Sequence, residues 1–88
     1  MPSRRTPLPD WIYDRRRALG HRIAALRIER SLSQDQLASA AGMERRSIQR
    51  YEAGVRDPRF SDLLLIAAAL DVSISDLLAV PSSSHGNA

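Results

Sequence analysis

Cysteine is missing from this sequence, and its absence excludes disulfides, thiol catalysis and cysteine-based zinc sites. The two histidines, His21 and His85, are too few and too far apart in the sequence to predict a metal site. Long apolar runs are also missing, because the longest one, residues 63–70, is far too short to span a bilayer. The first residues lack the apolar core of a secretory signal, so we expect a cytoplasmic protein.

Patterns typical of catalysis are absent as well. The residues supply no nucleophile with its base, no pair of carboxylates suited to a cleft and no glycine-rich phosphate loop. We therefore predict that the protein is not an enzyme and uses no cofactor.

Lysine does not occur either, so all thirteen basic side chains are arginine, against ten acidic ones. Residues 1–32 hold eight Arg and three acids, a net charge of +5, whereas residues 33–80 hold five Arg and seven acids, a net charge of −2. This uneven distribution suits a polyanionic partner such as nucleic acid. A chain of 88 residues that is 43% hydrophobic and 26% charged is typical of one small folded domain.

The most informative stretch is SQDQLASAAGMERRSIQRYEAG, residues 33–54. Ser33 and Gln36 have the spacing of a capping box, which predicts the start of a helix. Gly42 predicts its end, since glycine takes the left-handed cap conformation at little cost. A second short helix follows, and its outer face carries three arginines, Arg45, Arg46 and Arg50. Two short helices joined by a glycine turn are typical of a helix-turn-helix motif, whose second helix fits the DNA major groove.

The remaining sequence favours helices and no strands. Asp10 is the expected cap of a helix that either runs unbroken over 11–30 or is interrupted, with its main part starting at Ala18, because Gly20 breaks the pattern. Two further helices are expected over 60–70 and 74–80.

The ends differ from this domain, which we place at residues 10–80. Three prolines predict a flexible arm over residues 1–9, and the polar residues 81–88 predict a disordered tail. Arg4 and Arg5 on the arm are either solvated or reach into a minor groove. The run at residues 15–17 is either a solvated basic face or a phosphate contact.

Residues 19–78 resemble the lambda-repressor/Cro-like, or XRE-type, helix-turn-helix family. The resemblance rests on four segments in order, LGHRIAALRIERSLSQDQLA, AAGM, SIQRYEAGVRDP and LLLIAAALDVSISDLL. It implies an all-α, five-helix lambda-repressor-like domain, here with an N-terminal helical extension. It also implies a regulator of bacterial or phage type that binds specific sequences of double-stranded DNA and represses transcription.

The resemblance also implies roles for individual residues, with a recognition helix at about residues 44–53. Base contacts are implied for Arg45, Arg46, Arg50, Gln49 and Ser47. Phosphate contacts are implied for Gln34, Arg56, Arg59 and Tyr51, with a base edge as the alternative for Gln34, and a structural ion pair is implied for Arg27 with Glu52. Because arginine bonds well to guanine, we expect a guanine in each half-site of a near-palindromic operator bound by a homodimer.

Three departures from the family are visible. Glu44 stands where relatives usually have a capping Ser or Thr. Leu65 and Ala68 replace polar residues, and the extension begins with Trp11 and Ile12. The extension either covers Leu65 and Ala68 within the chain, which we favour, or leaves them to meet a second subunit.

A protein-interaction role is the alternative function. Small members of the family include antitoxins, in which DNA binding accompanies the capture of a protein partner. Residues 1–17, the apolar patch around Leu65 or the serine-rich tail are the segments available for such a partner.

Overall fold

The computed structural model describes residues 7–79, and within them the chain forms five helices and no strand. The helices are α1 (Asp10–Glu29), α2 (Gln34–Ala41), α3 (Arg45–Ala53), α4 (Phe60–Leu70) and α5 (Ile74–Leu77). The all-α prediction is confirmed over this part of the chain. Most of the predicted arm, with Arg4 and Arg5, and the whole predicted tail lie outside the described residues.

One continuous helix of 20 residues forms α1, so the interrupted alternative is wrong. Gly20 lies in its middle because α3 comes very close there. A Cβ atom at Gly20 would lie 2.4 Å from the carbonyl oxygen of Tyr51 and 2.5 Å from that of Glu52. The expected cap is wrong by one residue, since Asp10 is the first helical residue and Pro9 takes the cap position, with no side-chain cap bond.

The turn between α2 and α3 follows local sequence signals. The Gln36 amide donates to the Ser33 hydroxyl at 3.0 Å, and the Gln36 side-chain oxygen accepts from the Ser33 amide at 2.7 Å. The capping box is therefore confirmed. Gly42 ends α2 in the left-handed conformation, with φ 69° and ψ 34°. Glu44 holds the N-cap position of α3 without a side-chain cap bond.

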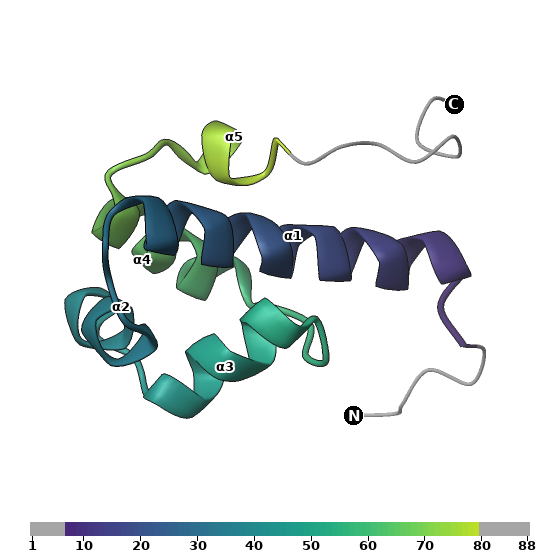
Figure 1. The fold of residues 1–88 in the computed structure, drawn as a ribbon. Helices are drawn as coiled ribbons and strands as arrows, with labels where there is room; N and C mark the ends of the chain where they lie inside the picture. Colours follow the sequence, from purple (N-terminus) through teal and green to yellow (C-terminus); the bar gives the residue numbers. More distant parts are fainter. Residues whose placement is uncertain (1–6, 80–88) are drawn as a thin grey trace.

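A single apolar core holds the five helices together. Its fully buried side chains come from every helix: Ile23, Leu37, Ile48, Ile66, Leu70 and Leu77. In Figure 1, α1 crosses the domain above α2 and α3, and α5 lies on its other side. Packing of α3 against both α1 and α2 leaves its opposite face directed away from the core.

The C-terminal part differs slightly from prediction. Helix α4 has the expected bounds, but α5 ends at Leu77 instead of continuing to residue 80. The sequence predicts that Leu77 and Leu78 both face inward; Leu77 is fully buried, whereas Leu78 is exposed because it follows the end of α5, so the prediction for Leu78 is wrong. None of the helices within residues 7–79 is long and apolar enough to cross a membrane.

Candidate nucleic-acid interface

The outer face of α3 is polar and exposed. Ile48 and Tyr51, three residues apart, are buried and fix the inner face of the helix. The opposite side carries the exposed residues Arg46, Gln49 and Arg50, and Arg45 is exposed beside them at the start of the helix. Ser47 is half-buried at the edge between the two faces. Four of the five residues with implied base contacts therefore share one exposed surface.

The arginines on this face are available to a ligand. Within residues 7–79, neither Arg46 nor Arg50 lies within ion-pair distance of a carboxylate. The Nε atom of Arg45 lies 3.7 Å from an oxygen of Asp35 on α2, and their side chains are 56% and 70% exposed. A solvated pair of this length contributes little free energy. It therefore leaves Arg45 able to exchange Asp35 for another partner.

On its inner side, α3 is held by an ion pair between Arg27 of α1 and Glu52. Arg27 Nε donates to one Glu52 oxygen at 2.7 Å and Nη2 to the other at 3.0 Å, while Nη1 donates to the Leu32 carbonyl at 2.8 Å. The Arg27 side chain is 14% exposed and the Glu52 side chain 7%. Hydrogen bonding to Glu52 raises the pKa of Arg27 above its usual value. The pair implied by the resemblance is present, and it fixes the position of α3 against α1.

Gln34 extends this network to α2. Its side-chain Nε2 donates to the Glu52 carboxylate at 3.0 Å, and the residue is half-buried. Glu52 thus accepts from two helices at once, so α1, α2 and α3 are joined by polar bonds beside the core. Gln34 helps to hold α3 in place, in addition to its predicted phosphate contact.

Tyr51 does not have the surface position that a phosphate contact requires. It is only 2% exposed, and its hydroxyl donates to the carboxylate of Asp62 on α4 at 2.5 Å. Burial and this hydrogen bond raise the pKa of Tyr51 above its usual value. We correct its role from DNA contact to structural link between α3 and α4. The spacing from Ile48 was a sequence signal for this inward position.

The loop between α3 and α4 carries the two other arginines with predicted phosphate contacts. Arg56 and Arg59 are both exposed, on either side of Asp57 and Pro58. Arg56 lies two residues after Gly54, which ends α3, whereas Arg59 is the N-cap residue of α4. Both side chains are exposed, and their phosphate contacts stay a prediction.

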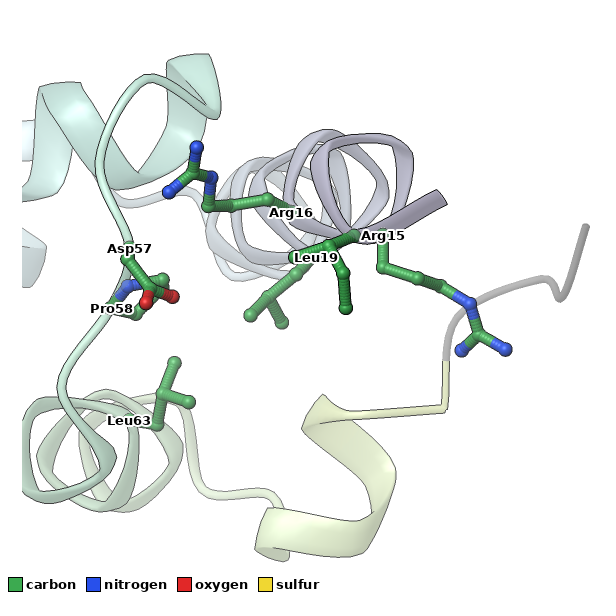
Figure 2. Close-up of a pocket in the computed structure, with 7 residues that line it drawn as sticks. Arg15, Arg16, Leu19, Asp57, Pro58 and Leu63 are labelled. Atoms are coloured by element: carbon green, nitrogen blue, oxygen red, sulfur yellow. The ribbon is translucent and has the colours of Figure 1, made fainter. Parts of the chain in front are cut away.

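The extension does not cover the apolar patch as expected. Leu65 is 45% exposed and Ala68 is exposed, although Trp11 and Ile12 are both half-buried. Ile12 instead lines an open hollow of about 210 Å³ with Leu63 and other residues of α1 and the loop before α4 (Figure 2). Leu63 and Leu65, two residues apart on a helix, point to different sides. Contact of Leu65 and Ala68 with a second subunit stays a prediction.

Groups of side chains suited to a metal ion do not occur among residues 7–79. The exposed side chains of α3 and of the loop after it include five arginines: Arg45, Arg46, Arg50, Arg56 and Arg59. Such an arrangement can bind anionic and hydrogen-bond-accepting groups.

Comparison with known proteins identifies similar regulators. The sequence model of the helix-turn-helix family HTH_3 matches residues 23–77. The restriction-modification controller protein C.AhdI from Aeromonas hydrophila is 33% identical, with a TM-score of 0.69, over 73% of this chain and 96% of that one. The hypothetical transcription factor NHTF from Neisseria is 29% identical, with a TM-score of 0.74, over 90% of each chain. SinR, the master regulator for biofilm formation, solved in complex with DNA, is 33% identical, with a TM-score of 0.65, over 68% of this chain and 97% of that one. No curated protein matches this sequence.

Proposed function

This chain belongs to the helix-turn-helix family HTH_3 of DNA-binding transcription regulators, and we propose that it reads specific duplex sequences with α3 in the major groove. The observation that carries the proposal is the division of α3 into two faces. The inner face is fixed by Ile48, Tyr51 and Glu52, while the outer face presents exposed arginines. A rigid helix with free donors is what recognition of base edges requires.

We assign the base contacts to Arg45, Arg46 and Arg50, with Gln49 and Ser47 beside them. Each arginine can donate two hydrogen bonds to O6 and N7 of guanine, and each such pair contributes about 1–3 kcal/mol of discrimination. At least one guanine is therefore expected in each half-site. Because this single domain reads few base pairs, two copies on a near-palindromic operator are the expected arrangement, with half-sites about one helical turn apart.

Phosphate contacts set the register of α3 along the duplex. We assign them to Arg56 and Arg59 in the loop after α3, and to Gln34 at the start of α2, where the helix amides also attract anions. These contacts release counterions from DNA, so the affinity is expected to fall steeply with salt.

The second copy is proposed to dock on the outer face of α4. Phe60, Leu64 and Leu65 are 62%, 43% and 45% exposed, and Ala68 lies one turn beyond Leu64. Such a contiguous apolar face is typical of an interaction site. A dimer on the operator blocks access to the promoter, so we propose that the protein represses transcription in a bacterial cytoplasm. We propose no catalytic role.

The exposed α4 face also favours a second candidate function. In this alternative the chain is an antitoxin-type or other protein-interaction module, in which α4 binds a different protein and DNA binding is secondary. The two functions differ in what the arginines of α3 do, because a pure protein-binding module does not need them.

Selection of binding sites from random duplexes tests the proposal, because it yields the operator, its symmetry and the spacing of half-sites together. The Arg46→Ala/Arg50→Ala variant is then compared with wild type on the selected operator and on random duplex. We expect the variant to lose the preference for the operator, whereas Arg15→Ala keeps it, because the Arg15 side chain extends away from the loop after α3 (Figure 2). Recovery of no preferred sequence by the wild-type protein would count against DNA reading and favour the second function.

A further inference from the structure

The first part of α1 lies outside the residues that the family model matches. The family match begins at residue 23, whereas α1 begins at Asp10. Residues 15–17 in this part are three consecutive arginines, and the phosphate contacts assigned above do not include them. The positions of Arg16 and Arg17 relative to α3 and the loop after it indicate whether these two arginines can also contact DNA.

Arg17 of α1 lies directly against the C-terminal end of α3. Gly54, which ends α3 with φ +73°, is so close that a Cβ atom there would lie 2.8 Å from Arg17 Cγ and 2.9 Å from Arg17 Cα. The Arg17 side chain is 56% exposed, and its guanidinium pairs with Asp14, which is 54% exposed. An ion pair so exposed contributes little free energy, so a phosphate can replace Asp14.

Arg16 is held in place by an aromatic ring instead of by an acid. Its guanidinium carbon lies 4.8 Å from the centre of the Tyr13 ring, and its Nε is buried without a hydrogen-bond partner. Asp57 lines the same hollow, yet within residues 7–79 no carboxylate is within ion-pair distance of Arg16. Figure 2 shows Arg16 reaching toward the loop after α3, while Arg15 extends away from that loop.

We infer that Arg16 and Arg17 form a phosphate-binding border that continues the α3 surface beyond the family domain. This inference rests on the proposed DNA binding. Arg17 lies against the end of α3, and Arg16 faces the loop that carries Arg56. The border therefore adjoins two elements to which DNA contacts are assigned above. That continuity favours the DNA backbone over an acidic protein as the partner. Because phosphates are the same in every sequence, the border adds affinity without adding specificity.

The salt dependence of binding tests the inference. The Arg16→Gln/Arg17→Gln variant and wild type are titrated on the selected operator and on random duplex at several salt concentrations. Two lost contacts should reduce the slope of log K against log salt by about 1.8, since each contributes about 0.9. Wild type should then lose about tenfold more affinity than the variant over a fourfold rise in salt. The preference for operator over random duplex should stay unchanged.

Arg15→Gln is the matched control, because it removes the same charge from the adjacent position, whose side chain extends away from the loop after α3 (Figure 2). Its slope should stay close to that of wild type. Asp14→Asn is the second variant, which keeps both arginines and frees Arg17 from its acid. It should bind every duplex more tightly than wild type, and it tests the inference independently of how well the double variant folds.

Three outcomes overturn the inference. The first is a double variant with the wild-type slope, and the second is an equal loss of slope in Arg15→Gln, which would show only a general effect of charge. If the double variant keeps the wild-type slope and also changes its oligomeric state in sedimentation, the third outcome, the extension is assigned to protein contact instead. If wild type binds no duplex at all, the proposed function itself fails, and this is known before any variant is compared.

Discussion

The two faces of α3 differ in how tightly their side chains are held. On the inner face, Ile48 and Tyr51 are buried and Glu52 accepts hydrogen bonds from both α1 and α2. On the outer face, Arg46 and Arg50 are exposed and have no acidic partner within residues 7–79. The inner face therefore fixes where the helix lies, and the outer face is left to meet a ligand. Different residues hold α3 in place and contact the DNA bases, so substitutions can change the stability of the protein and its DNA specificity separately.

The largest expected effect comes from the inner face. Glu52→Ala leaves Arg27 partly buried without its carboxylate, and removal of one partner of such a pair costs about 3 kcal/mol of unfolding free energy. Chemical denaturation measures this loss. Arg27→Met/Glu52→Leu removes both charges and should recover much of it. A Glu52→Ala protein as stable as wild type would show that the pair does not hold α3.

The outer face should behave in the opposite way. Arg50→Ala is expected to cost about 1–3 kcal/mol of discrimination between the operator and a site with the matching base pair changed. The unfolding free energy should stay within about 0.5 kcal/mol, as for most surface substitutions. Competition binding and thermal unfolding of the same protein measure the two quantities. A large loss of stability with unchanged discrimination would reverse the assignment of the two faces.

The third test concerns the link from the inner face to α4. Tyr51→Phe removes the hydrogen bond to Asp62, and we expect a loss of about 1.5 kcal/mol at neutral pH. Because the native pKa of Tyr51 is raised, its contribution is complete below the unfolded pKa of about 10 and is lost as pH rises through the higher native value. Denaturation of both proteins at several pH values should show the difference closing only under alkaline conditions. A gap that closes near neutrality would contradict the assigned bond.

The smallest effect is expected where α3 begins. Glu44 makes no cap bond, unlike Ser33 at the start of α2. Glu44→Ser should therefore stabilise the protein by about 0.5–1 kcal/mol, and Ser33→Ala should destabilise it by about 1 kcal/mol. Denaturation midpoints give both values. The Glu44 prediction does not hold if the serine variant is less stable than wild type.

Features that depend on residues a few positions apart could be predicted from the sequence. The capping box at Ser33, the left-handed Gly42 and the bounds of α4 all follow from local hydrogen bonding and side-chain spacing. The outward position of the α3 arginines follows from the same rules, because Ile48 fixes which face is buried.

Contacts between distant segments could not be predicted from the residues themselves, and the pair of Arg27 with Glu52 was implied only by the resemblance. Gly20 reads as a break in the helical pattern, but the carbonyl oxygens of α3 require a residue without a side chain there. Tyr51 was assigned to phosphate through the resemblance, and its partner Asp62 is known only once α4 is placed. The contact of Ile12 with the hollow beside Leu63, away from Leu65, likewise depends on how α1 crosses α4.

The bond between Gln34 and Glu52 fixes the orientation of the glutamine amide at the start of α2. A carboxylate only accepts hydrogen bonds, so the NH₂ group of Gln34 must face Glu52, at 3.0 Å, and the amide cannot turn over. One N–H is used there, and the other is left to donate. The amide oxygen keeps its own fixed place as an acceptor, so the bond to Glu52 sets the orientation in which Gln34 offers its remaining N–H to a phosphate oxygen.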